Sequence, residues 1–268
     1  MRWLLTLALT GPAAAAAAAD PDRPNVLLVV ADDLGYADLG FTGCKDIPTP
    51  HLDRLAADGC RCDQAYVVSP YCSPSRAGLL TGRHPARYGY EFNPTGERAK
   101  GAPPPGLIAG VPTLAERLKD AGYATGAVGK WHLGSGPKHT PAARGFDDFF
   151  GFLGGAHAYL PGKAGAAIRR GDDPVEEKDY LTAAFGREAC AFIDRHKKEP
   201  WFLSLAFNAV HDPLQPREED LPRVPKAEGK KRQPYAGMLV ALDDAVGRVR
   251  DKLKREGLDR NTLVVFLS

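Results

Sequence analysis

The side chains best suited to chemistry occur at three separate points in the sequence, each directly after a run of apolar residues. Carboxylates bind hard divalent cations, whereas lysine and histidine can bind an anion and transfer protons. Each residue alone is weak evidence, because an Asp-Asp pair often forms a turn and a single histidine is more often structural. Together they would suit hydrolysis of an anionic substrate held against a cation. The residues are Asp32 and Asp33, then Lys130 and His132, then Asn208 and His211.

A fourth feature is the segment from Cys72 to Arg76, CSPSR, which continues as AGLLTGR. Pro74 and Ser75 favour the opening turn of a helix, and Gly82 favours its end. Cys72 is therefore expected at a helix N-terminus, where backbone N–H groups favour an anion. Spacing alone leaves two other interpretations open, a buried or disulfide-bonded cysteine and a thiolate nucleophile.

Apolar runs and helical periodicity predict the elements that must position these residues. Alternating strands and helices predict an α/β fold, in which a mainly parallel, mixed sheet is sandwiched by helices. Ligands of such sheets bind beyond the carboxyl ends of the strands, so the residues above are expected to converge there. Predicted strands cover residues 25–30, 124–128, 201–207 and 262–267, and predicted helices cover residues 49–59, 113–121, 180–197 and 235–256.

Two long stretches without periodicity, residues 93–110 and 152–179, interrupt the alternation. Loops of this length are usually functional or mobile, and we expect both to form walls of a substrate cleft. The basic run at residues 226–232 is interpreted as a solvated loop rather than a site.

Composition indicates an ordinary folded domain, with 44% hydrophobic and 25% charged residues in 268. The net charge is only +2, and the basic residues are spread along the chain rather than clustered. Both observations argue against nucleic acid as a partner. Residues 1–19 have a basic start, a short apolar run and an alanine tract, as in an export signal. The mature protein is expected to begin near Asp20, without a membrane span, and to be periplasmic or secreted.

Five cysteines are present, and in an exported protein an odd number leaves one without an intrachain partner. No CxxC pair of the kind that holds structural zinc occurs. How the cysteines other than Cys72 pair, if they pair, stays open: these are Cys44, Cys60, Cys62 and Cys190.

The segment CSPSRAGLLTGR resembles the signature of the formylglycine-dependent (type I) sulfatases, whose C-x-P-S-R cysteine is oxidised to formylglycine. The resemblance covers nearly all of the chain from Arg23 to Ser268. It implies an alkaline-phosphatase-like fold and hydrolysis of sulfate esters, either of sulfated carbohydrates or of aryl sulfates. The other matching segments, in order, are RPNVLLVVADDLGYADLG, TPHLDRLAADG, AGYATGAVGKWHLG, GFDDFFGFLGG and FLSLAFNAVHDPLQ.

The resemblance also implies a cation site and a modified residue. Asp32 and Asp33, with Cys72 as formylglycine, would bind Ca²⁺, or Mg²⁺ as the alternative. Arg76 would steady the formylglycine hydrate. A formylglycine-generating enzyme, or an anaerobic sulfatase-maturating enzyme, would be the partner that oxidises Cys72.

Three further roles follow from the same resemblance. Lys130 would bind the sulfate, and His132 would deprotonate a hydroxyl of the hydrate. His211 would lie near the leaving oxygen and protonate it.

In sulfatases the last strand runs into Asp-Asn-Gly, which completes the cation site, and a smaller C-terminal subdomain follows. The sequence to Ser268 contains neither. We therefore expect residues 20–268 to be an N-terminal sulfatase catalytic domain that is truncated before this motif, with little activity as it stands.

Three alternatives remain at this point. One is a formylglycine-type phosphodiesterase or phosphonate hydrolase, and another is an inactive, truncated protein that binds sulfated glycans. A phosphatase with a serine or threonine nucleophile is disfavoured, because Cys72 occupies that place.

Overall fold

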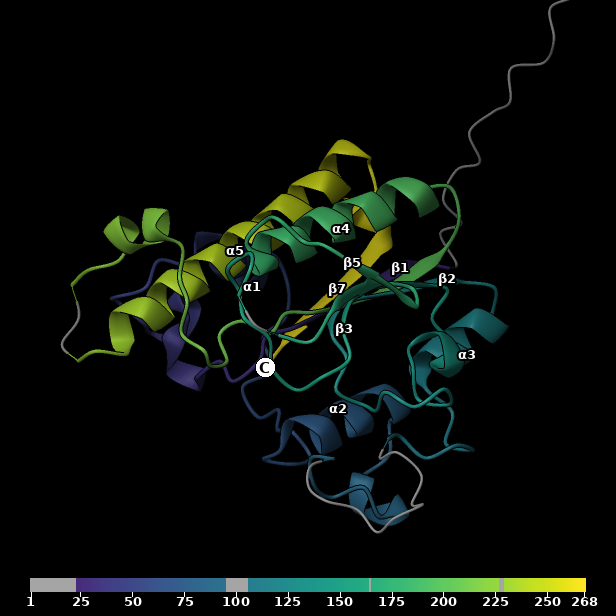
Figure 1. Cartoon of the computed structure of the whole chain (residues 1–268). Helices are drawn as coiled ribbons and strands as arrows, with labels where there is room; N and C mark the ends of the chain where they lie inside the picture. Colours follow the sequence, from purple (N-terminus) through teal and green to yellow (C-terminus); the bar gives the residue numbers. More distant parts are fainter. Residues whose placement is uncertain (1–22, 95–105, 164, 227–228) are drawn as a thin grey trace, which may run out of the picture.

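A computed structural model of the chain describes residues 23–94, 106–163, 165–226 and 229–268 (Figure 1). The predicted export signal at residues 1–19 lies outside the described residues, as do residues 95–105 of one predicted cleft wall. Within the described ranges, no helix is both long enough and apolar enough to cross a membrane.

A mixed, mainly parallel sheet forms the centre of the described structure, as predicted. The strand order is β5-β4-β3-β2-β6-β1-β7; β4 pairs antiparallel with β3 and with β5, and the other pairs are parallel. Every residue of β6 is buried, because helices cover the sheet on both faces. The strands are β1 (Asn25–Val30), β2 (Ala124–Lys130), β3 (Asp148–Phe152), β4 (Ile168–Arg170), β5 (Asp173–Val175), β6 (Trp201–Ala206) and β7 (Thr262–Leu267).

Three of these strands were not predicted. β3 continues the sheet beyond β2, and β4 and β5 are strands of three residues at its edge. The predicted irregular stretch 152–179 is therefore partly sheet, and this expectation was wrong. The short strands carry charged residues and no apolar run, so the pairing of β4 with β3 and of β5 with β4, rather than a sequence pattern, defines them.

Helices α1, α4 and α5 cover one face of the sheet, and α2 and α3 lie on the opposite face (Figure 1). Each face has its own apolar core. The larger core packs α4 and α5 against the sheet, and the smaller packs α2 and α3. The helices are α1 (Pro50–Asp58), α2 (Cys72–Thr81), α3 (Leu114–Asp120), α4 (Leu181–His196) and α5 (Arg232–Arg255).

The N-terminus of α1 is capped from a distant part of the chain. Thr49 is the N-cap residue, as predicted, but its side chain makes no capping bond. The buried carboxylate of Asp243 on α5 instead accepts hydrogen bonds from the backbone N–H groups of His51 and Leu52, at 3.1 and 2.8 Å. This contact ties α1 to α5 and thereby fixes the first helix against the larger core.

The helix α5 begins three residues earlier than predicted. Arg232 lies in its first turn and forms ion pairs with Asp38 and Asp46, at 2.7 and 2.9 Å. The prediction of a solvated loop at 226–232 is therefore wrong for Arg232. This residue belongs to α5, and its ion pairs with two carboxylates from the segment after β1 hold its side chain against the protein.

Candidate functional site

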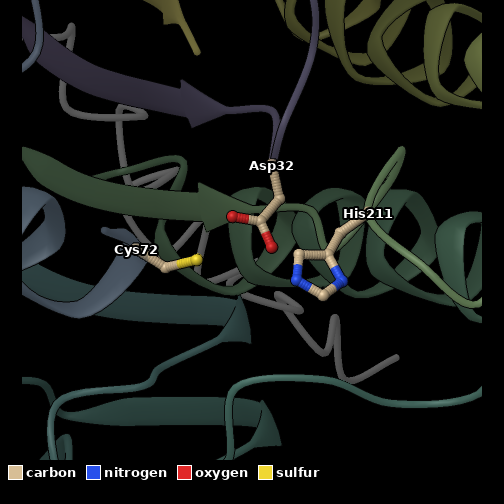
Figure 2. Close-up of side chains that lie close together, drawn as sticks. All are labelled: Asp32, Cys72 and His211. Carbon is tan, nitrogen blue, oxygen red and sulfur yellow. The ribbon is translucent and has the colours of Figure 1, made fainter. Parts of the chain in front are cut away.

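The carboxyl ends of β1, β2 and β6 meet on one edge of the sheet, as parallel strands require. Asp32 follows β1, Lys130 is the last residue of β2, and His211 lies in the loop after β6. Helix α2 begins at Cys72 against the same edge. Figure 2 shows the side chains of Asp32, Cys72 and His211 turned toward one another, and their ligand atoms all lie within 4.8 Å.

Asp32 is the negative centre of the site and is only 5% exposed. Its Oδ2 accepts a hydrogen bond from Nζ of Lys130 at 2.5 Å, and its Oδ1 accepts one from Arg76 at 3.1 Å. Burial alone would raise the pKa of Asp32, but the charges of Arg76 and Lys130 outweigh it and lower the pKa below its ordinary value. The carboxylate therefore stays ionised at neutral pH.

Arg76 and Lys130 place two buried positive charges close to residue 72. Arg76 lies one turn along α2 from Cys72, and its second guanidinium nitrogen donates to the backbone carbonyl of Lys130 at 2.9 Å. The side chain of Lys130 is wholly buried. Positive charge held at fixed positions inside the protein suits a doubly or singly charged oxyanion.

Cys72 and His211 form a hydrogen-bonded pair. The bond to His211 lowers the pKa of the half-buried Cys72 thiol, although burial opposes this shift. The same bond raises the pKa of His211 to about 9. The imidazole is therefore charged at neutral pH in this state and can donate a proton to an atom near residue 72.

His132 has the opposite character. Burial, reinforced by the charges of Lys130 and Arg76, lowers the pKa of His132 to about 4. Its Nδ1 is buried and makes no hydrogen bond within the described part of the chain. A neutral imidazole with a free nitrogen beside two cations can accept a proton at neutral pH.

The backbone around His132 is held in an uncommon conformation, with φ at +55°. Its carbonyl accepts a hydrogen bond from Oγ of Ser73, and its N–H donates to Leu153 at 3.2 Å. A side chain at Gly155 would place its Cβ 2.7 Å from the imidazole ring. These contacts leave the ring little freedom, so Ser73, the residue that follows Cys72 along α2, helps to position His132.

Asp33 is placed differently from Asp32. Its side chain is 61% exposed, its φ is +57°, and its Oδ2 lies 3.7 Å from Nε2 of His211. Asp33 is not part of the group of ligand atoms within 4.8 Å. The carboxylates of Asp32 and Asp33 supply oxygen ligands of the type that a divalent cation such as Ca²⁺ prefers. Ca²⁺ favours about six to eight such oxygens.

Sequence reasoning missed Tyr159, which supports the loop that carries His211. Its buried hydroxyl lies 2.5 Å from the carbonyl oxygen of Asn208 and 2.8 Å from that of His211. Tyr159 falls in the predicted irregular stretch, where no periodicity marks it. Asn208, predicted as a site residue, is buried, and its Oδ1 makes no hydrogen bond within the described ranges.

Two clefts open beside these residues. One of about 490 Å³, the Cys72 cleft, is lined by Asp32, Asp33, residues 65–72, and Leu267 with Ser268 at the end of β7. The other, of about 480 Å³, the Arg232 cleft, is lined by His211. Asp33 borders both clefts. The Arg232 cleft is further lined by Asp38, Asp212, Leu214, Lys231, Arg232 and Tyr235.

Comparison with known proteins identifies relatives across nearly the whole chain. A family profile described as Sulfatase matches residues 24–268. The chain is 36% identical to N-acetylgalactosamine-6-sulfatase of Mus musculus, over 99% of this chain and 53% of that protein. It is 33% identical to an arylsulfatase of Klebsiella aerogenes, over 96% of this chain and 68% of that protein.

A solved structure is similar in fold as well as in sequence. The crystal structure of Ps i-CgsB has a TM-score of 0.85 and 42% identity, over 91% of this chain and 58% of that one. The same protein is also solved in complex with k-i-k-neocarrahexaose. The chain spans about half the length of the N-acetylgalactosamine-6-sulfatases that it matches.

Proposed function

Because the chain belongs to the sulfatase family, we propose that it carries the reaction centre of a sulfuric ester hydrolase with residue 72 as nucleophile. One observation supports this assignment above the others. A buried cationic pair, Lys130 and Arg76, lies at the same edge of the sheet as residue 72 and two histidines: His132, whose pKa is lowered to about 4, and His211, which lies close to residue 72. A sulfate group needs the cations, and its transfer needs one proton acceptor and one proton donor.

We propose that Cys72 is oxidised to formylglycine by a formylglycine-generating or an anaerobic maturating enzyme. The hydrated aldehyde supplies two hydroxyl groups on one carbon, one to attack the sulfur and one to expel the sulfate. A cysteine or serine at this position lacks the second hydroxyl.

Each charged residue then has a separate task. Lys130 and Arg76 offset the negative charge of the sulfate oxygens. His132, which is neutral above about pH 4, accepts a proton from a hydroxyl on residue 72. His211 donates a proton to the leaving alcohol oxygen, since one nitrogen of its ring faces residue 72.

Asp32 and Asp33, with an oxygen on residue 72, would hold Ca²⁺, with Mg²⁺ as the alternative. The cation would supply further positive charge beside the sulfate oxygens. We propose that residues 20–268 are the N-terminal part of a longer catalytic domain. The carboxyl end of β7 enters the Cys72 cleft, so a residue that followed Ser268 would enter the same cleft and could add a ligand.

A sulfated carbohydrate is the proposed substrate, with aryl sulfates as the alternative. If His211 protonates the leaving oxygen, the alcohol extends from it into the Arg232 cleft. That cleft combines carboxylates, a lysine and a tyrosine with the apolar side chain of Leu214, a mixture that suits a ring bearing several hydroxyl groups. The complex of Ps i-CgsB with k-i-k-neocarrahexaose supports this proposal. An exported, periplasmic or secreted, protein would meet such substrates.

The test is the product released from three substrate types by protein with formylglycine at residue 72. Sulfated oligosaccharide, aryl sulfate and phosphate diester are compared at equal concentration. We expect sulfate release to be fastest from the oligosaccharide. Faster cleavage of the diester would favour the phosphodiesterase alternative, and binding of the oligosaccharide without any release would favour a glycan-binding protein.

A further inference from the structure

We propose that the thiol form of the protein, in which Cys72 has not been oxidised, binds zinc through Cys72, His211 and Asp32. The inference does not depend on the proposed function, because it concerns the chain with the cysteine in place. Its ligand set differs from that of the proposed Ca²⁺ site, since it includes His211 and a sulfur atom.

The geometry of the three side chains is the first observation. They come from three elements, the end of β1, the start of α2 and the loop after β6, yet their ligand atoms lie within 4.8 Å of one another. Ligand atoms on one tetrahedral zinc ion lie about 3.3 to 3.7 Å apart, given the usual bond lengths to sulfur, nitrogen and oxygen. Small side-chain rotations would therefore close the site without movement of the backbone.

The orientation of His211 is the second, independent observation. Its Nδ1 lies 2.6 Å from the backbone carbonyl oxygen of Asp212. A carbonyl oxygen only accepts hydrogen bonds, so Nδ1 carries the proton in that contact and Nε2 is the nitrogen available to a metal. In Figure 2 one ring nitrogen faces Asp32 and Cys72 while the other faces away. A backbone carbonyl on the remote nitrogen is the usual support of a zinc-binding histidine.

The types of the donor atoms decide which metal fits. Thiolate and imidazole favour zinc, whereas Ca²⁺ takes oxygen ligands. The fourth position would be taken by Asp33, whose Oδ2 is already 3.7 Å from Nε2 of His211, or by water. Binding would displace into solvent the proton that Cys72 and His211 share.

Asp32 is expected to contribute least of the three ligands. Both of its oxygens already accept hydrogen bonds from Lys130 and Arg76, although each oxygen retains a second lone pair. The two cations also repel a metal ion. Cys72 and His211 should therefore account for most of the affinity, and Asp32→Asn should weaken binding less than Cys72→Ala does.

The experiment uses the full chain produced without a maturating enzyme, with the thiol at residue 72 confirmed by peptide mass. Cys60 and Cys62 are exposed and could bind metal themselves, so both are replaced by serine in every sample. Zinc alone, cobalt alone and calcium alone are then measured by equilibrium dialysis. Alkylation of Cys72 by iodoacetamide is followed with and without each metal.

We expect a single zinc ion per chain, slower alkylation of Cys72 in its presence, and thiolate-to-cobalt charge-transfer absorption with cobalt. Cys72→Ala and His211→Ala should each weaken zinc binding by at least about tenfold. Cys190→Ala and His196→Ala, which alter a thiol and an imidazole on α4, should leave it unchanged. Circular dichroism shows whether each variant is folded.

Two outcomes would overturn the proposal. One is zinc binding by folded Cys72→Ala protein as tight as that of the parent chain. The other is a parent chain that takes up no zinc and whose Cys72 reacts at the same rate with and without it. Neither outcome bears on sulfate ester hydrolysis by the formylglycine form, which is measured separately.

Discussion

Nζ of Lys130 lies 2.5 Å from Oδ2 of Asp32, and both side chains are buried at the carboxyl edge of the sheet. The lysine ends β2 and the aspartate follows β1, with β6 between the two strands. Because neither side chain is exposed to solvent, removal of one would leave the other with a buried charge and one partner fewer. The positions of these two charges in the site therefore depend on how β1, β6 and β2 pack side by side.

Lys130→Ala should reduce kcat for sulfate ester hydrolysis about 10²- to 10³-fold, because it removes a fixed positive charge next to the sulfate oxygens. It should also destabilise the fold, since Asp32 loses a buried partner. Steady-state kinetics and urea denaturation measure the two effects. Lys119→Ala removes a lysine from an exposed pair with Asp147 and should change neither. A Lys130→Ala enzyme with the kcat of the parent would contradict the assignment.

The rate should depend on pH through His132. Its pKa, lowered to about 4 mainly by burial, keeps the ring neutral at neutral pH, so kcat should fall only as the pH drops toward 4. His132→Ala should lower kcat about 10²- to 10⁴-fold and abolish this acid limb. A limb centred near the ordinary histidine value of 6.5 would show that His132 is not the proton acceptor.

The same shift has a consequence for stability. The pKa of His132 in the folded protein is lower than in the unfolded chain, so protonation favours unfolding. The free energy of unfolding should therefore decrease as the pH falls from about 6.5 through 4, and His132→Gln should remove part of that decrease. Urea denaturation at several pH values measures it, and an identical pH dependence in the variant would contradict the linkage.

Cys72→Ser should trap a covalent adduct. A serine hydroxyl can attack the sulfur of a sulfate ester, but it offers no second hydroxyl to expel the sulfate. After incubation with substrate, intact mass should therefore rise by one sulfuryl group. Cys190→Ser, a change on α4 away from the site, should form no adduct and should keep its turnover; sustained turnover by Cys72→Ser would rule out the two-hydroxyl scheme.

Gly129→Ala should destabilise the protein by about 2 kcal/mol or more and lower activity as well. Gly129 has a φ of +112°, and a Cβ there would lie 1.9 Å from the carbonyl oxygen of Ala206 on β6. The residue directly precedes Lys130, so any shift of β2 moves the lysine. Gly43→Ala is the matched control, because its φ is +110° but nothing lies within 4 Å; equal losses in both variants would show that φ alone matters.

Much of the fold could be predicted from the sequence, because apolar stretches mark four of the strands. β1, β2, β6 and β7 were located in this way, and their parallel arrangement brought Asp32, Lys130 and His211 to one edge as expected. β4 and β5 were missed, because three-residue edge strands with charged side chains carry no periodic pattern.

The contacts within the site were less accessible to sequence reasoning. The roles of Lys130 and Arg76 toward the substrate stay predictions, and in the structure both side chains contact Asp32. The support of the His211 loop by Tyr159 could not have been foreseen, because it joins segments about fifty residues apart through backbone carbonyls. Such contacts depend on the packed fold rather than on any local pattern.

The central claim is that hydrolysis requires formylglycine at residue 72. The most direct measurement is the rate of sulfate release by samples of the gene product that differ only in the fraction of Cys72 oxidised, with that fraction determined by peptide mass. We predict that the rate rises in proportion to the oxidised fraction and vanishes in the thiol form. A rate that does not depend on this fraction, or that persists in the thiol form, would contradict the claim.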